Sequence, residues 1–306
     1  LRTVMIPKAI CELGSNTFAV SGLREVSFAD GSKISTIGGC AFRGCQIEEF
    51  HVPDGVTAIE QSTFYFCQNL KVLEFGKNSN CQMIGDEAFS DCLSLEKLEL
   101  PSKMRSIRSR ALWNSGLKEI IIGKGIETIE EGAFSHCQKL NTIAVDSGNR
   151  IYTAENGVLF NKEKTELLIY PAGKTGNYQI PDAVEKIRDS AFDGASKLEN
   201  IYFNKKITEI GGYAFSECTA LCVPELPSGL VTIGENAFEY CTSFNSELVI
   251  PKTVVSVGRF AFFMDYDLNR IVIESDSSIS RIGYGAFGYC GIEDFTIPEN
   301  VSSMGQ

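Results

Sequence analysis

The chain has 306 residues, of which 43% are hydrophobic and 22% charged, a composition that excludes disordered, collagen-like and fibrous proteins. Its 28 Lys and Arg against 39 Asp and Glu give a formal net charge of −11, which disfavours binding to nucleic-acid phosphate or anionic lipid. No apolar run approaches the roughly 18 residues of a membrane-spanning helix, and residues 1–30 lack the layout of a signal peptide. We therefore predict no nucleic-acid partner and no membrane insertion by this segment.

One pattern recurs along the whole chain: Ile, four residues, then Phe, with a small residue directly before the Phe. Subtracting successive Phe positions gives intervals of 24, 22, 25, 23, 22, 58, 23, 23, 24 and 25 residues. Intervals of 22 to 25 residues are typical of a solenoid in which each coil adds one layer. The sequence therefore predicts a single solenoid domain over residues 1–306, eleven to thirteen coils long. The Phe position is occupied by Phe18, Phe42, Phe64, Phe89, Leu112, Phe134, Phe192, Phe215, Phe238, Phe262 and Phe287.

Five or six residues after each Phe position comes another apolar residue, and most of these begin a second pattern, Leu-x-x-φ-x-φ with φ apolar, as in 70–75, 95–100, 117–122 and 268–273. Alternation of apolar and polar residues predicts a short strand with one buried face. Proline often follows, because it has no amide hydrogen to donate to a ladder. We expect a right-handed solenoid with a parallel sheet on one face, each coil consisting of one strand, a turn and the segment that leads to the Phe.

The repeated Phe predicts the core. Ten of the 20 Phe residues occupy the one repeat position, so their rings should form a wholly buried stack. Ala or Thr precedes the position in every copy, as expected where a neighbouring coil lies close. Gly often follows the Ile, for example at Gly38 and Gly234, which indicates a tight bend or a positive φ.

The interval of 58 residues marks an irregular insert at 146–180 between regular coils at 1–145 and 181–306. In it, two apolar runs flank the polar residues 161–164, which is a hairpin signal. The hairpin either protrudes as a binding lobe or forms a wider coil that keeps the core continuous, and we favour the wider coil.

Seven of the eleven cysteines occupy the position three residues after the Phe, and other copies have Ser, Ala or Asp there. A small buried filler tolerates such replacement, whereas a disulfide or a metal ligand does not, so we expect reduced, buried thiols. The seven are Cys45, Cys67, Cys92, Cys137, Cys218, Cys241 and Cys290. Any disulfide would instead involve the off-register Cys11, Cys40, Cys81 and Cys222.

The sequence offers no catalytic or cofactor motif. The two histidines, His51 and His136, lie in different coils at different repeat positions, which disfavours a metal site or a Cys–His pair. Phosphate-binding, dinucleotide-binding and serine-hydrolase motifs are missing from the sequence, and Asp265-Tyr-Asp267 matches only part of a calcium loop. We predict a protein that is not an enzyme and binds no cofactor or metal.

The exposed middle positions of the strands are the remaining candidate site. They grade from acidic in the first half of the chain to apolar in the second, which suits a basic or mixed protein surface. The simpler interpretation is a solvated sheet face in an acidic protein. The predicted protein-binding residues are Glu49, His51, Glu74, Glu99, Glu119, Ile121 and Tyr202.

The Leu-x-x-φ-x-φ strand with its 23-residue period resembles a leucine-rich repeat, and the continuation Ile-Gly-x-x-Ala-Phe-x-x-Cys looks like the BspA-type subfamily. The insert is similar to an irregular repeat of the same family. The resemblance covers essentially the whole chain. It implies a cell-surface or secreted protein of bacteria or protists that adheres to protein or glycoprotein, such as a host matrix protein.

The chain begins within a strand motif and stops before the next Ala-Phe, with a polar cap at neither end, so we interpret it as a fragment whose signal and anchor lie outside it. We expect a monomeric, non-enzymatic recognition or adhesion module that uses its sheet face. Two alternatives remain: a scaffold or accessory region of a larger surface enzyme, and an intracellular protein-interaction scaffold. A signal peptide upstream in the full-length protein would exclude the intracellular scaffold.

Overall fold

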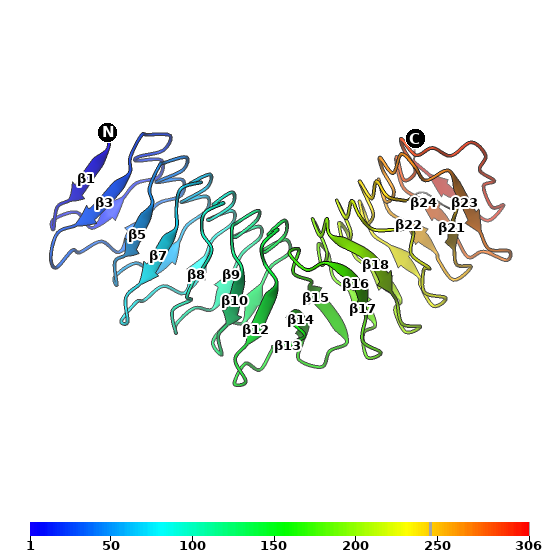
Figure 1. The fold of residues 1–306 in the computed structure, drawn as a ribbon, viewed down its shortest axis with the longest axis horizontal. Coiled ribbons are helices and arrows are strands. Elements are labelled where there is room, and N and C mark those ends of the chain that lie inside the picture. Colours follow the sequence, from blue (N-terminus) through cyan, green and yellow to red (C-terminus); the bar gives the residue numbers. More distant parts are fainter. Residues whose placement is uncertain (245–246, 306) are drawn as a thin grey trace. The chain divides into compact units, whose positions relative to one another are not determined.

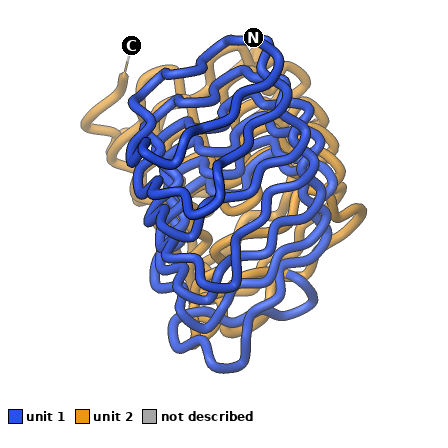
Figure 2. Tube along the Cα trace, turned by 90° about the vertical axis from the view of Figure 1, so that its left-hand side faces the viewer, with its two compact units in different colours: residues 1–157 blue, residues 158–306 orange. Residues whose placement is uncertain are grey.

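The computed structural model of the chain describes residues 1–244 and 247–305. The backbone divides into two compact units, residues 1–157 and 158–306, which Figure 2 shows in different colours. Each unit is a stack of coils carrying short parallel strands (Figure 1). The chain is a parallel-strand β-solenoid of about 13 turns, about 23 residues apart, and its described residues form no helix. The predicted solenoid and its period are confirmed.

The longer strands of unit 1, except the one at 152–155 in the insert, lie where the Leu-x-x-φ-x-φ pattern predicts them. They pair in parallel as β1 with β3, β5 with β7 and β10 with β12, and β1 and β5 end directly before a proline. The bounds are Thr3–Ile6 (β1), Glu25–Phe28 (β3), Glu49–Val52 (β5), Val72–Phe75 (β7), Glu119–Ile122 (β10), Thr142–Val145 (β12) and Tyr152–Glu155 (β13). The strand predicted at 95–100 is not formed.

Unit 1 has a second parallel ladder that the sequence analysis did not predict. It consists of two-residue strands, most of which end at the Ile of the repeat. The backbones of neighbouring coils pair there, just before the chain turns toward the Phe. β2 pairs with β4, and the other four follow the order β6-β8-β9-β11. The bounds are Glu12–Leu13 (β2), Thr36–Ile37 (β4), Ala58–Ile59 (β6), Met83–Ile84 (β8), Ser106–Ile107 (β9) and Thr128–Ile129 (β11).

Unit 2 repeats both ladders. Its longer strands pair in parallel as β16 with β18 and β21 with β23, and the other ladder follows the order β14-β15-β17-β19-β20-β22-β24-β25. The longer strands are Val158–Asn161 (β14), Glu166–Ile169 (β15), Gly176–Gln179 (β16), Leu198–Tyr202 (β18), Glu247–Ile250 (β21) and Arg270–Ile273 (β23). The two-residue strands are Lys186–Ile187 (β17), Glu209–Ile210 (β19), Thr232–Ile233 (β20), Ser256–Val257 (β22), Arg281–Ile282 (β24) and Ser303–Met304 (β25).

The Phe rings stack along the inside of each unit. Phe64 and Phe89, for example, have ring centroids 5.4 Å apart and planes only 5° from parallel. The inner rings of the column are buried, but Phe18 and Phe287 are only half-buried. The prediction of a wholly buried column is therefore wrong at these two rings, because each stacks against a column ring on one side only.

The backbone adopts a left-handed conformation on both sides of each Phe. Residues two before and two after the Phe have positive φ, as at Cys40 (58°) and Gly44 (67°) around Phe42. The Gly that follows the Ile was expected to mark a tight bend or a positive φ, and Gly38 and Gly234 do not have a positive φ. A Cβ on Gly234 would instead lie 2.4 Å from the backbone of Gly211, so this glycine is required by the close approach of the neighbouring coil.

The predicted hairpin of the insert is formed by β14 and β15, which pair antiparallel. Phe160 and Leu167 of these strands belong to the buried core of unit 2, together with Tyr170. The Tyr170 ring stacks on Phe192 with centroids 4.8 Å apart, and its amide donates to the Ala191 carbonyl as a core Phe does. The apolar part of the hairpin is therefore a coil of the core, and Tyr170 occupies a Phe position that the sequence analysis missed.

The in-register cysteines form a column beside the rings, and each thiol is a hydrogen-bond donor. Cys67 Sγ, for example, donates to the Phe42 carbonyl at 3.0 Å, and Cys137 Sγ donates to the Leu112 carbonyl at 3.0 Å. All members are buried except Cys290, which is half-buried, and all eleven cysteines are free thiols. Asp265 occupies this column between Cys241 and Cys290, with no exposed surface.

Candidate functional site

The parallel register places the exposed middle residues of neighbouring strands side by side. In unit 1, His51 of β5 lies opposite Glu74 of β7, and Ile121 of β10 lies opposite Ala144 of β12. The apolar residues on either side of each point into the core, since the burial of these strands alternates. We call the surface formed by the exposed residues of the longer strands and of the equivalent strandless segments the strand face.

The structure places six of the seven predicted binding residues on the strand face of unit 1. Glu49 and Glu119 take the first position of their strands, whereas His51, Glu74 and Ile121 take the third, so the acidic residues belong to two columns. Glu99 is exposed on the strandless segment that follows β7. The seventh residue, Tyr202, ends β18 in unit 2 and is exposed there.

Two of the predicted acidic residues have a nitrogen-bearing partner on the same face. His51 Nδ1 lies 3.0 Å from Glu74 Oε2, and Lys97 Nζ lies 2.6 Å from Glu99 Oε1. The hydrogen bond from Lys97 lowers the pKa of Glu99. All four side chains are exposed, and such pairs contribute little to stability. The strand face of unit 1 is therefore a mixed surface with an apolar centre at Ile121, which is 64% exposed.

Among the described residues, three coils lack the longer strand, and a hollow borders each of them. The strandless segments are 97–100 in unit 1 and 223–226 and 293–297 in unit 2. In the part of the chain that the structure describes, their backbones make no hydrogen bond to a neighbouring coil. The hollow in unit 1 holds about 380 Å³ and those in unit 2 about 710 Å³ each. The strand face therefore has depth where the ladder is interrupted.

Glu225 also belongs to this surface, although it was not among the predicted binding residues. Pro224 occupies the apolar position before it, so the segment 221–226 did not stand out as a strand, although its spacing matches Leu-x-x-φ-x-φ. Pro224 is buried like the apolar residue it replaces, and Glu225 is exposed at the middle position. Allowing Pro at an apolar position would have identified Glu225.

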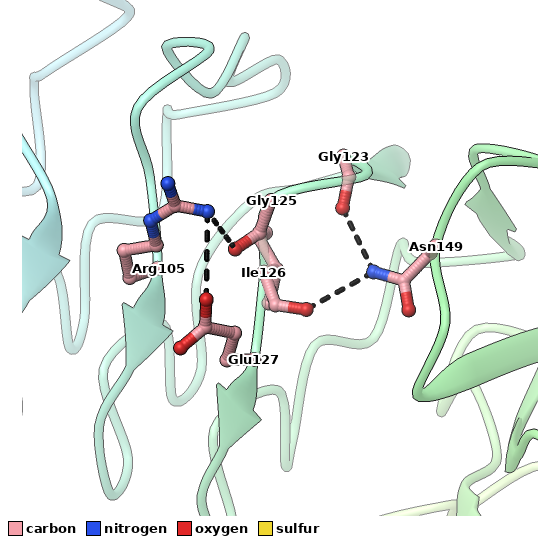
Figure 3. Close-up of polar contacts among 6 residues, drawn as sticks. All are labelled: Arg105, Gly123, Gly125, Ile126, Glu127 and Asn149. Carbon is pink, nitrogen blue, oxygen red and sulfur yellow. Dashed lines mark hydrogen bonds and ion pairs between the residues drawn. The ribbon is translucent and has the colours of Figure 1, made fainter.

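A buried asparagine fixes the turn that follows β10, as Figure 3 shows. Asn149 Nδ2 donates to the carbonyls of Gly123 and Ile126 at 2.9 and 3.0 Å. Asn204 makes an equivalent pair of bonds in unit 2. Each asparagine satisfies carbonyls of the preceding coil, and this contact holds the end of the strand that carries Ile121.

The residues that the structure describes contain no group of three or more His, Cys, Asp or Glu side chains that could hold a metal ion. Asp265, part of the partial calcium-loop match, points into the thiol column, and its Oδ1 accepts the amide hydrogen of Cys241 at 2.7 Å. Over the same residues, no helix is long and apolar enough to cross a membrane.

Comparison with solved structures finds similar folds among bacterial proteins. A leucine-rich cell surface protein from Faecalibacterium prausnitzii is 28% identical with a TM-score of 0.81, over 100% of this chain and 79% of that one. The pneumococcal vaccine antigen PcpA is 25% identical with a TM-score of 0.68, over 98% and 73%. A leucine-rich repeat protein from Eubacterium ventriosum is 26% identical with a TM-score of 0.55, over 83% and 87%.

A search of curated proteins finds no match. The model of the BspA-type leucine-rich repeat region, in contrast, matches residues 1–80, 74–175, 170–278 and 245–306. These matches span the chain, and they agree with the Phe column, the paired strands and the thiol column described above. The chain belongs to the BspA-type leucine-rich repeat family.

Proposed function

We propose that the chain is a non-enzymatic recognition module of a bacterial cell surface that binds a protein or glycoprotein through its strand face. Leucine-rich repeat solenoids of this family are generally non-catalytic and bind proteins. The similarity to a bacterial cell surface protein over the full chain supports the location. A signal peptide encoded upstream would support the extracellular form of the proposal, and its absence from the full-length protein would contradict it.

The observation that carries the proposal is the exposure of large apolar side chains on strands held in register. Ile121 of unit 1 is 64% exposed and Tyr202 of unit 2 is 50% exposed, while the residues beside them in sequence pack into the core. Anchors of this kind, surrounded by polar groups, are typical of interfaces of about 800 Å² per partner. A broad face that exposes such anchors favours a macromolecular partner over a small substrate.

The test is binding of the chain to a panel of purified extracellular matrix glycoproteins, measured by surface plasmon resonance. Ile121→Asp and Tyr202→Asp should each weaken binding at least tenfold, because each places a charge at the centre of its part of the face. Val20→Asp is the matched control, since Val20 is exposed on the turn beside the Phe column. If the control weakens binding as much as the two variants, or if the wild-type chain binds no member of the panel, the proposal in this form is wrong.

A further inference from the structure

The strand face of unit 2 is interrupted between β18 and β21. The intervening segment 223–226 forms no strand, and Pro224 has no amide hydrogen to give to a ladder. Tyr202 and Val249 line the resulting hollow, together with Val223 and Pro251. Its volume of about 710 Å³ lies within the range of roughly 300–1,000 Å³ that is typical of ligand sites.

The lining of this hollow combines an aromatic ring with an excess of negative charge. Glu225, Glu247 and Glu274 line it, against a single cation, Lys205. Three negative charges and one positive charge leave a net charge of −2. The Tyr202 side chain is half exposed beside them, so a bound group would meet both carboxylates and a π face.

The three carboxylates are not equally available. Arg270 Nε lies 3.1 Å from Glu247 Oε2, and the amide of Lys252 donates to Glu274 Oε2 at 2.9 Å. Glu225, in contrast, makes no ion pair or side-chain hydrogen bond with any described residue. The uncompensated charge therefore belongs to the side chain in the middle position of the strandless segment.

In the hollow of unit 1, lysines of the chain itself pair with the carboxylates. That hollow also borders a strandless segment, and its lining includes Lys71 and Lys97. Lys71 Nζ lies 2.7 Å from Glu48 Oε2, and Lys97 Nζ lies 2.6 Å from Glu99 Oε1. Unit 2 has the same type of hollow without such a partner for Glu225, so its electrostatics favour a cation from outside.

We propose that the hollow around Glu225 receives a basic side chain, in particular an arginine, from the protein partner. A guanidinium is planar, donates two parallel hydrogen bonds to one carboxylate and stacks on an aromatic ring. Because Glu225 and Tyr202 line the same hollow, one guanidinium can pair with the carboxylate and face the ring, the arrangement that gives cation–π attraction at ~6 Å or less. The inference rests on the proposed function, because it assigns partner chemistry to part of the strand face.

The experiment is an NMR titration of the ¹⁵N-labelled chain with the blocked peptide acetyl-Gly-Arg-Gly-amide. The control peptide has citrulline in place of arginine, which keeps the shape and removes the charge. The arginine peptide should give saturable shifts confined to amides around 200–205, 222–228 and 247–251, and the citrulline peptide should give none. Equal shifts with both peptides, no saturable shift, or shifts located elsewhere would overturn the inference.

Two variants sharpen the test. Glu225→Gln should weaken binding of the arginine peptide at least fivefold. Glu199→Gln should leave that binding unchanged, since Glu199 is an exposed carboxylate of β18 outside the hollow. An unchanged affinity in Glu225→Gln, with the wild-type spectrum retained, contradicts the proposal. If the peptide fails to bind while Tyr202→Asp still abolishes partner binding, only this inference fails. If the arginine peptide binds but substitutions on the strand face leave partner binding unchanged, the proposed function fails instead.

Discussion

Phe89 is representative of the ring column at the scale of a residue. It is fully buried, it stacks on Phe64, and the next coil has Leu112 in place of a ring. Coils lie on both sides of it, so neither neighbour can collapse into a space left by its ring. Replacing an inner Phe of the column by a small residue should therefore lower the free energy of unfolding substantially.

We expect Phe89→Ala to lower the free energy of unfolding by about 3–5 kcal/mol, the usual cost of a large core cavity. Urea unfolding followed by the fluorescence of Trp113, the only Trp of the chain and a neighbour of Leu112 in sequence, measures this loss within unit 1. Phe66→Ala is the control, because Phe66 is 48% exposed. Similar losses in both variants would show that the column is not the core.

Asp265 gives the stability a pH dependence. Cys241 donates its amide hydrogen to Oδ1, Oδ2 has no partner, and burial raises the pKa of Asp265 to about 8. In the unfolded chain an Asp ionises near pH 4. Between about pH 4 and 8 the folded chain therefore keeps a proton that the unfolded chain has released, so the free energy of unfolding falls as the pH rises, by up to about 1.4 kcal/mol per unit.

Asp265→Asn should flatten this profile and raise stability at pH 8, because the neutral amide fits the site without the cost of burying a charge. Thermal unfolding at pH 5, 6.5 and 8 measures it. Asp267→Asn, an exposed carboxylate two residues further on, should leave the profile unchanged. A wild-type chain that becomes more stable between pH 5 and 8, or an unaltered profile in Asp265→Asn, contradicts the assignment.

The thiol column predicts a labelling pattern. Cys11 and Cys222 are exposed and should react within minutes with a maleimide at pH 7. Burial raises the pKa of Cys67 to about 12 and that of Cys137 to about 11. These buried thiols are therefore inaccessible to the reagent and stay protonated, and only the thiolate reacts. Mass spectrometry before and after denaturation counts the labels. Rapid labelling of Cys67 in the native chain would show that the column faces solvent.

At the scale of an element, the turn around each Phe depends on two left-handed positions. Gly44 and Gly194 occupy the second of them in their coils, whereas Val20 occupies it in the first coil with a φ of 55°. A branched side chain is unfavourable in this conformation by roughly 1–2 kcal/mol. The first turn is therefore strained at Val20, a residue that is 79% exposed.

Val20→Gly should raise the free energy of unfolding by about 0.5–1 kcal/mol, since relief of strain exceeds the entropy cost of glycine. The reverse substitution, Gly44→Val, should lower it by a similar or larger amount, because Gly44 has the same conformation. Denaturant unfolding of both variants measures the pair. If both substitutions change the free energy of unfolding in the same direction, this position does not favour glycine.

Several elements could be predicted from the repeat, and the exceptions have physical causes. The pattern that predicts β5 and β10 also predicts a strand at 95–100, where Leu98 is buried and Glu99 exposed but no ladder forms. Alternation reports which side chains are buried, not whether neighbouring backbones pair. The two-residue strands have no alternation at all, so the second ladder could not be predicted.

The insert shows the same limit. Tyr170 lies 170 − 134 = 36 residues after Phe134 and 192 − 170 = 22 residues before Phe192, so only one of its intervals matches the period. The hairpin of β14 and β15 accounts for the extra residues. A Phe-based pattern cannot find a Tyr at this spacing, although the two rings are equivalent in packing.

At the scale of the whole molecule, the net charge of −11 acts on association rather than on the fold. Glu49, Glu74 and Glu99 are exposed on the strand face of unit 1. Reversing all three to Lys should slow association with a basic partner at least tenfold at low salt. The difference should shrink as ionic strength rises, because the screening length falls to about 3 Å at 1 M.

The matched control reverses Glu12, Glu127 and Glu131, which changes the net charge equally but lies outside the longer strands. Stopped-flow or surface plasmon resonance at several salt concentrations measures both triples. Equal slowing by the two triples would show that only the net charge matters. If the triple on the strand face does not slow association, the partner binds at another surface.

The hydrogen bonds between coils govern how the chain can change in length. Asn16, Phe18 and Val20 donate their amides to the next coil, and the left-handed residues and Phe of that coil donate onward in the same way. Duplication of one complete repeat therefore recreates every type of bond at the new junctions, whereas insertion of half a repeat sets turn residues against strands. We expect natural length variants of this protein to differ by multiples of about 23 residues, because selection retains only insertions that keep the coils in phase.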